Sequence, residues 1–222
     1  MTWSVPNILT VFRLLASPAV ALAFVLLPRP FADWLALFLF VGAALTDWVD
    51  GVIARAWGQT SRFGAMLDPI ADKAMVVIAL AVLLALFGIN LWLAVPVALI
   101  LFREVFVSGL REYLGSVAGN LKVTKLAKWK TSVQMIAISA LLASGIFQHY
   151  FGMWSWGMSP EMVGQVLDGA LPDELGLRAI WQAAVITTNG GLALLWLAAL
   201  LTVVTGVDYF VKALPHLREP LP

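Results

Sequence analysis

The sequence contains no cysteine, which excludes disulfide bonds, thiolate metal sites and a cysteine nucleophile. Charge is also scarce, since only 12% of the 222 residues are charged, whereas a soluble domain carries about a quarter. Basic and acidic residues nearly balance at a net charge of +1, so no bulk field favours a nucleic acid partner. Apolar residues dominate instead, at 61% of the chain with a mean hydropathy of +0.91. These values predict a membrane protein.

Six apolar segments approach the ~20 residues that a helix needs to cross a bilayer core. They cover residues 8–27, 31–54, 70–88, 91–110, 131–147 and 189–211. We predict an all-α polytopic membrane protein with six transmembrane helices, organised as a single domain over residues 1–222. Residues 148–188 are too polar to span, so we expect an extramembrane insertion between the fifth and sixth helices. Within it, residues 160–171 are predicted to form a short interfacial helix.

Lysine and arginine are distributed unevenly between the two ends of the predicted spans. If the N-terminus is cytoplasmic, twelve of the 14 basic residues fall on the cytoplasmic side, and only Arg29 and Arg178 fall on the other. Cytoplasmic loops of membrane proteins carry such an excess of positive charge. We therefore expect both termini to be cytoplasmic.

Two pairs of aspartates flank the short loop between the second and third predicted spans. Asp47 and Asp50 are three residues apart, and Asp68 and Asp72 are four residues apart. Either spacing brings both carboxylates to one face of a helix. Because the connecting loop is short, the two helices should be antiparallel neighbours whose acidic faces meet at the cytoplasmic membrane edge.

Four clustered carboxylates repel one another and are costly to desolvate, and a hard divalent cation relieves both problems. Oxygen ligands suit Mg²⁺, Mn²⁺ or Ca²⁺, and two ions about 3.5–4 Å apart suit displacement at phosphorus. The small residues Gly51, Ala54 and Gly64 let a ligand or a helix approach the backbone closely. Arg55 can hold a phosphate through two hydrogen bonds.

This stretch resembles the signature of the CDP-alcohol phosphatidyltransferases, in which the fixed positions are Asp, Asp-Gly, Ala-Arg, Gly, Asp and Asp. All eight positions match at the family's spacing: Asp47, Asp50, Gly51, Ala54, Arg55, Gly64, Asp68 and Asp72. Residues 6–13, 103–114 and 125–135 are similar to the bacterial branch of this family that makes phosphatidylglycerophosphate. Two features depart from that branch: Ala127 stands where glycine is frequent, and residues 148–188 form a longer segment than usual.

The resemblance implies transfer of a phosphatidyl group from CDP-diacylglycerol to a small alcohol, with release of CMP. It implies two Mg²⁺ or Mn²⁺ ions held by four aspartates, with Asp72 also acting as the catalytic general base. The metal ligands are then Asp47, Asp50, Asp68 and Asp72. The residues expected to bind CDP-diacylglycerol are Asn7, Thr10, Arg13, Asp50, Gly51, Ala54, Arg55 and Gly64. Helix capping is an equally good interpretation of Asn7.

The acceptor alcohol in this branch is sn-glycerol 3-phosphate, which gives phosphatidylglycerophosphate in phospholipid biosynthesis. Its dianionic phosphate needs basic partners. The residues expected to bind it are Arg103, Arg111, Lys128, Lys130 and Thr131. A structural ion pair with Glu104 is an alternative interpretation of Arg103. The resemblance also implies a homodimer in the bacterial inner (plasma) membrane, with the active site on the cytoplasmic side.

Several alternatives stay open at this point. Inositol phosphate would use similar cations, whereas serine would not need them, and phosphatidylglycerol as acceptor would mean cardiolipin synthesis. An ion transporter could use buried aspartates, but transporters place charges near the bilayer midplane and are built from repeats, which the sequence lacks. Isoprenoid-type transferases also use aspartates with Mg²⁺, but in soluble helical folds and at other spacings.

Overall fold

A computed structural model describes residues 5–57, 62–115, 119 and 125–217, without the side chains of residues 5–6, 47–57, 62, 65, 125, 127 and 128. Within these ranges the chain forms seven α-helices and no strand, so the all-α prediction is confirmed. The helices are α1 (Val5–Leu26), α2 (Phe31–Trp57), α3 (Arg62–Phe87), α4 (Leu91–Leu114), α5 (Lys125–Trp154), α6 (Pro160–Asp168) and α7 (Leu177–Leu217).

The lengths and compositions of these helices fit a polytopic membrane protein. Five helices are long and apolar enough to cross a membrane, namely α1, α3, α4, α5 and α7. The described side chains of α2 add a shorter apolar helix over Phe31–Thr46. Each of the six predicted spans therefore corresponds to a helix. Large apolar side chains such as Phe38, Phe102 and Leu200 are exposed on the outside, as contact with lipid requires.

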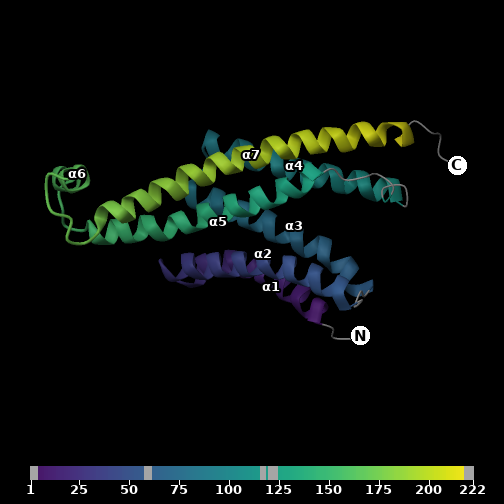
Figure 1. Cartoon of the computed structure of the whole chain (residues 1–222), viewed down its shortest axis with the longest axis horizontal. Helices are drawn as coiled ribbons and strands as arrows, with labels where there is room; N and C mark the ends of the chain where they lie inside the picture. The colour runs from purple at the N-terminus through teal and green to yellow at the C-terminus, as the bar shows by residue number, and fades with distance from the viewer. Residues whose placement is uncertain (1–4, 58–61, 116–118, 120–124, 218–222) are drawn as a thin grey trace.

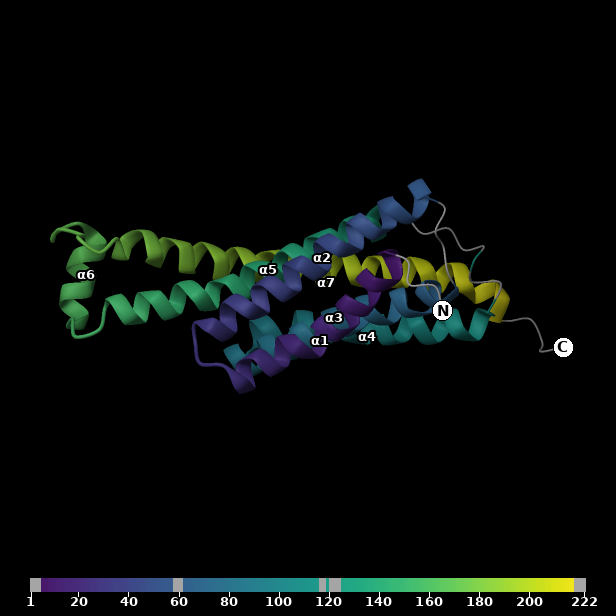
Figure 2. The same ribbon diagram turned by 90° about the horizontal axis from the view of Figure 1, so that it is seen from below.

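The helices run roughly along one long axis, with both chain ends at the same end of the molecule (Figure 1). α1 packs against α2 and α3, while α7 packs along α5 and against α4, and α2 contacts α5 (Figure 2). Phe40, Leu80, Ile138 and Leu195 are fully buried in one apolar core, and they come from α2, α3, α5 and α7. The core thus holds helices from both halves of the chain together.

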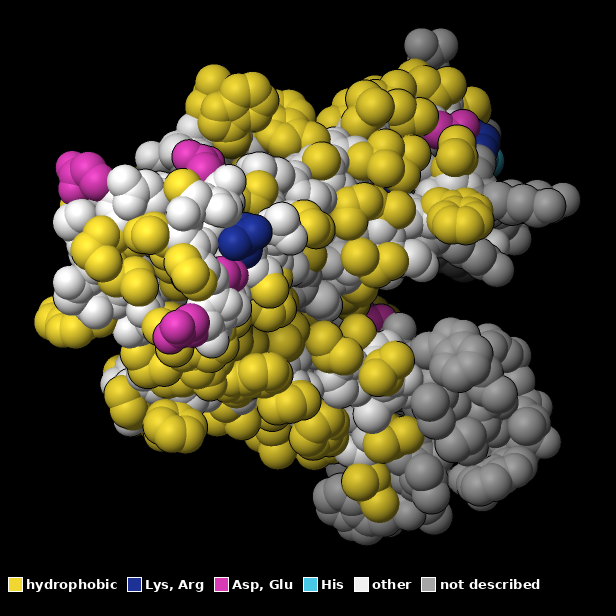
Figure 3. Space-filling view, turned by 60° about the vertical axis from the view of Figure 1, so that its left-hand side comes forward, with side chains coloured by type: hydrophobic (Ala, Val, Ile, Leu, Met, Phe, Trp, Pro, Cys, Tyr) yellow, Lys and Arg dark blue, Asp and Glu magenta, His cyan; other side chains and the backbone are white. Residues whose placement is uncertain are grey.

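α5 and α7 extend beyond the other helices and carry α6 at their far end, opposite the chain termini (Figures 1 and 2). α7 has 41 residues, and at about 1.5 Å per residue it is roughly 60 Å long, twice the thickness of a bilayer core. With that end turned toward the viewer, Figure 3 shows acidic side chains gathered there and hydrophobic ones over much of the remaining described surface.

Two helices reach into the predicted insertion over residues 148–188, whose extramembrane position stays a prediction. α5 continues to Trp154, and α7 begins at Leu177 instead of residue 189. The two helices support each other there, since the rings of Phe151 and Trp181 lie 4.9 Å apart between centroids. The short helix expected over residues 160–171 is confirmed as α6, which ends at Asp168. Its interfacial position stays a prediction.

The first turn of α7 has a side-chain cap. The carboxylate of Asp173 accepts hydrogen bonds from the backbone N–H groups of Leu177 at 2.7 Å and Arg178 at 3.0 Å. These bonds, that of Arg178 foremost, lower the pKa of Asp173 below its ordinary value. Capping satisfies N–H groups that have no partner within the helix, so Asp173 fixes where α7 begins.

An ion pair between an exposed arginine and a buried aspartate closes the connection between α1 and α2. Arg29 donates from Nε and Nη2 to the carboxylate of Asp33, at 2.8 and 2.5 Å, and Asp33 is buried. The side-chain hydrogen bond to Asp33 raises the pKa of Arg29 above its ordinary value. Gly145 of α5 leaves room for this pair, because a Cβ there would lie 2.5 Å from Arg29 Nη2. The pair therefore joins the α1–α2 connection to α5.

Candidate active site

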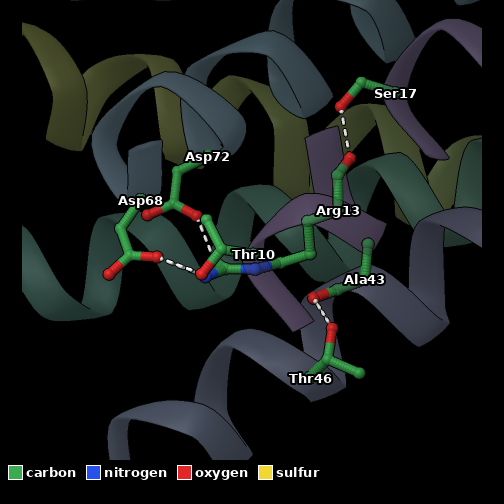
Figure 4. Close-up of polar contacts among 7 residues, drawn as sticks. All are labelled: Thr10, Arg13, Ser17, Ala43, Thr46, Asp68 and Asp72. Carbon is green, nitrogen blue, oxygen red and sulfur yellow. Dashed lines mark hydrogen bonds and ion pairs between the residues drawn. The ribbon is translucent and has the colours of Figure 1, made fainter. Parts of the chain in front are cut away.

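Polar side chains of α1 meet the two aspartates of α3 (Figure 4). Arg13 donates from Nη1 to Oδ1 of Asp72 at 2.5 Å and from Nη2 to Oδ1 of Asp68 at 3.1 Å. Thr10 lies one turn before Arg13 and donates its hydroxyl to the same oxygen of Asp68 at 2.6 Å. Two residues expected to bind CDP-diacylglycerol, Thr10 and Arg13, thus pack against the predicted acidic face of α3.

Burial differs sharply across this cluster. The Arg13 side chain is only 3% exposed, whereas those of Asp68 and Asp72 are 46% and 45% exposed. A single guanidinium balances one of the two carboxylate charges, so the three side chains keep a net negative charge. Arg13 therefore fixes the two carboxylates from inside the protein while leaving them accessible to a ligand.

Some of the other predicted residues lie on the same two helices, and some have side chains outside the described residues. Asn7 on α1 and Gly64 on α3 are both buried. Asn7 lies in the first turn of α1, so it does not cap that helix from the preceding position. The side chain of Lys128 lies outside the described residues. So do those of all the predicted residues on α2, namely Asp47, Asp50, Gly51, Ala54 and Arg55.

A cavity of about 440 Å³ opens beside Asp68 and Asp72. The predicted acceptor-binding residues with described side chains all line it, from α4 and α5. They are Arg103, Arg111, Lys130 and Thr131. The fold thus brings the predicted catalytic aspartate and the predicted acceptor residues, which lie far apart in the sequence, to one cavity.

Glu104 lies at the centre of the basic side of this cavity. Its Oε1 accepts a hydrogen bond from Nζ of Lys130 at 2.5 Å and another from Nη1 of Arg103 at 3.1 Å. The ion pair of Arg103 with Glu104, offered by the sequence as an alternative, is confirmed. The same carboxylate also holds Lys130, which is 5% exposed, so two cations share one anion and the group stays positive.

α7 supports the two arginines of the cavity. The guanidinium of Arg111 lies over the ring of Tyr209, 5.3 Å from its centroid, which is a cation–π contact. The stem of Arg103 passes Gly206, where an added Cβ would lie 3.0 Å from Cγ of the arginine. α7 therefore contributes to the cavity's shape although none of its residues was predicted for the site.

Three further residues with polar or charged side chains line the cavity without having been predicted for the site: Lys73, Glu104 and Gln134. Gln134 lies four residues after Lys130 on α5, so the two share a helix face. That spacing was available in the sequence and could have identified Gln134. The placement of Glu104 against Lys130 depends on the packing of α4 and α5, which the sequence pattern does not reveal.

The described residues fit a hard divalent cation, although they do not complete a site for one. Carboxylate oxygens on one face of α3, half exposed beside a cavity, are the donors that Mg²⁺ and Mn²⁺ prefer. Each hydrogen bond given above to Asp68 ends on Oδ1, so Oδ2 accepts none from the described side chains. Among those side chains no group of three or more metal ligands gathers. Asp47 and Asp50 would have to supply the rest.

Comparison with known proteins agrees with this geometry. The family model for CDP-alcohol phosphatidyltransferase matches residues 3–160, which span α1 to α5. A CDP-diacylglycerol–glycerol-3-phosphate 3-phosphatidyltransferase of Cereibacter sphaeroides is 55% identical over 99% of each chain. A protein of the same name from Pectobacterium atrosepticum is 39% identical over 84% of this chain and 90% of its own. A protein of the same name from Haemophilus influenzae is 41% identical over 64% of this chain and 77% of its own. The chain belongs to the CDP-alcohol phosphatidyltransferase family.

Proposed function

We propose that this protein is an enzyme that transfers the phosphatidyl group of CDP-diacylglycerol to sn-glycerol 3-phosphate, giving phosphatidylglycerophosphate and CMP. The observation that carries the proposal is the cavity that Asp72 shares with Arg103, Arg111 and Lys130. It combines a fixed carboxylate with a cationic pocket for a phosphorylated acceptor. The name shared by the relatives supports glycerol 3-phosphate over inositol phosphate, serine or phosphatidylglycerol as that acceptor.

In this reaction the C1 hydroxyl oxygen of the acceptor bonds to the phosphorus that carries diacylglycerol. The bond from that phosphorus to the oxygen of CMP breaks, and its electron pair leaves with CMP. Asp72 takes the hydroxyl proton as general base. Arg13, which donates to Oδ1 of Asp72 at 2.5 Å, orients that carboxylate. When bound by the four aspartates, Mg²⁺ or Mn²⁺ would neutralise negative charge on the diphosphate and on the leaving CMP.

The acceptor's phosphate would lie among Arg103, Arg111 and Lys130. Arg103 and Lys130 are held in place by Glu104 before any substrate arrives, so little ordering remains when the phosphate binds. A guanidinium has five N–H donors, and Arg103 uses one of them on Glu104, which leaves others for phosphate oxygens. A neutral acceptor would gain nothing from such a group.

We extend the proposal to the protein's membrane orientation, its location and its oligomeric state. The distribution of lysine and arginine supports an orientation with the cavity and both termini in the cytoplasm, and the two termini do share one end of the molecule (Figure 1). The bacterial relatives support the inner membrane as its location. The homodimer and the CDP-diacylglycerol contacts of α1 and α2 are proposed from the resemblance to the family.

The test is an acceptor panel on purified protein in detergent. CDP-diacylglycerol and Mg²⁺ or Mn²⁺ are mixed separately with glycerol 3-phosphate, inositol phosphate, serine and phosphatidylglycerol, and CMP release is followed. CMP release with glycerol 3-phosphate alone, abolished by Asp72→Asn, is the expected result. Release with a different acceptor would keep the reaction type and replace the acceptor. No release with any acceptor from folded protein would contradict the enzyme assignment.

A further inference from the structure

Gln134 is a buried amide that no described residue satisfies. It lies on α5, is 3% exposed and lines the cavity. Its Oε1 is buried and has no hydrogen-bond partner within the described part of the chain. Buried polar atoms are rarely left unpaired, and a polar side chain inside a membrane helix is costly unless it is used. The amide is therefore available for a ligand in the cavity.

The position of Gln134 relates it to the acceptor rather than to the nucleotide. Lys130 lies one helical turn nearer the start of α5, about 6 Å along the axis, on the same face. That rise is on the scale of the distance between the phosphate oxygens and the C2 hydroxyl of an extended glycerol 3-phosphate. Glu104 anchors Lys130 on the basic side of the cavity, so an acceptor whose phosphate contacts Lys130 can extend its carbon chain along α5 toward Gln134.

The chemistry of an amide suits a secondary hydroxyl. Its carbonyl accepts a hydrogen bond and its NH₂ group donates one, so it can pair with a hydroxyl in either sense. The attacking C1 hydroxyl is assigned to Asp72 in the proposed reaction. The only other hydroxyl of sn-glycerol 3-phosphate is on C2, between the phosphate and C1. Gln134 is the cavity's uncharged amide, and the C2 hydroxyl is the acceptor's remaining uncharged polar group.

We infer that Gln134 is a specificity-determining residue that hydrogen-bonds the C2 hydroxyl of the acceptor. The inference rests on the proposed function and deepens it. A site built to hydrogen-bond a hydroxyl strongly rejects the analogue that lacks it, because its buried polar group is then left unpaired. Gln134 would thus select glycerol 3-phosphate among phosphorylated primary alcohols.

The experiment compares two acceptors in two proteins. 3-Hydroxypropyl phosphate keeps the phosphate and the attacking hydroxyl of glycerol 3-phosphate and lacks only the C2 hydroxyl. For the unaltered enzyme, kcat/KM should be roughly 100-fold lower with this analogue. Gln134→Leu should lose activity with glycerol 3-phosphate and little with the analogue, so that the two values agree within about threefold. The KM for CDP-diacylglycerol should not change.

Gln165→Leu on α6 is the matched control, since this exposed glutamine lies away from the cavity, and it should keep the 100-fold preference. Folding is checked by the melting temperature in detergent, and Gln134→Ala makes the same comparison if the leucine variant does not fold. An unaltered enzyme that uses both acceptors equally, or a variant that keeps the full preference, would overturn the inference. If glycerol 3-phosphate were no substrate at all, the proposed function itself would fail, which is a different result.

Discussion

Glu104 of α4 and Lys130 of α5 form a 2.5 Å ion pair across the cavity, and neither side chain is more than one-fifth exposed. Lys130 therefore has a fixed position although its side chain is long and intrinsically flexible. The contact joins two helices whose first residues are 34 positions apart. It also brings a negative charge into a pocket that we propose for a phosphate, which makes the role of Glu104 one of positioning.

Glu104→Ala should raise the KM for glycerol 3-phosphate about tenfold, equivalent to about 1.4 kcal/mol, because Lys130 and Arg103 lose a charge-assisted partner. Glu104→Gln keeps a carbonyl acceptor and should cost less. The KM for CDP-diacylglycerol should stay constant in both variants. Steady-state CMP release measures both KM values in each variant and in the unaltered protein. A lower KM in Glu104→Ala would mean that repulsion from the carboxylate outweighs positioning.

Arg13→Lys should lower kcat by about 30-fold, or about 2 kcal/mol, because an ammonium cannot bridge Asp68 and Asp72 with the geometry of a guanidinium. The KM for glycerol 3-phosphate should change little. Arg29→Lys is the matched control, since Arg29 also binds a carboxylate through two nitrogens but lies at the other end of α1. Equal losses in both variants would point to a general folding defect.

Gly145→Ala should destabilise the protein by about 1–3 kcal/mol, because the added methyl group meets Arg29 and the buried carboxylate of Asp33. Gly152→Ala on the same helix has no atom within 4 Å of its Cβ, and it should be neutral or stabilising by up to about 1 kcal/mol. Melting temperatures in detergent compare the two. Because the cavity lies elsewhere, the folded Gly145→Ala protein should keep its activity, and loss of activity without loss of stability would contradict this account.

The start of α7 should loosen in acid. Backbone N–H groups of Arg178 and Leu177 lower the pKa of Asp173, so its cap is fully effective above its ordinary pKa near 3.8 and is lost as the pH falls through the lowered value in the folded protein. The protection of the first-turn amides of α7 against hydrogen exchange, measured relative to the intrinsic rate at each pH, should therefore fall in that acidic range. Asp173→Ala should exchange fast already at pH 7, and slow exchange there would show that the cap is dispensable.

The sequence was sufficient for features that depend on local pattern. Long apolar runs predicted the helices α1 to α5, because a helix that crosses the lipid bilayer needs such a run. The four-residue spacing of Asp68 and Asp72 placed both on one face of α3, and Arg13 of α1 does contact both of them. On α7, Asp208 and Lys212 are four residues apart and form an ion pair at 2.6 Å, a contact that depends on local spacing alone.

Features that depend on contacts between distant residues were missed. α7 continues through the polar residues near Thr188 because α5 supplies a partner: Gln148 donates from Nε2 to the Thr188 hydroxyl at 3.2 Å. Thr187 satisfies its own hydroxyl by donating it to the carbonyl of Ala183 at 2.6 Å. A hydropathy pattern counts these residues as polar. It contains no information on whether their side chains form hydrogen bonds within the protein.

The uninterrupted length of α7 has a mechanical consequence. A single helix carries the cap at Asp173 and α6 at one end, and Gly206 and Tyr209, which support the arginines, toward the other. Because these features share one helix, a change in the tilt of α7 would move Gly206 and Tyr209, and with them the contacts that support the two arginines. The thickness of the surrounding bilayer, by setting that tilt, would thereby act on the width of the acceptor pocket.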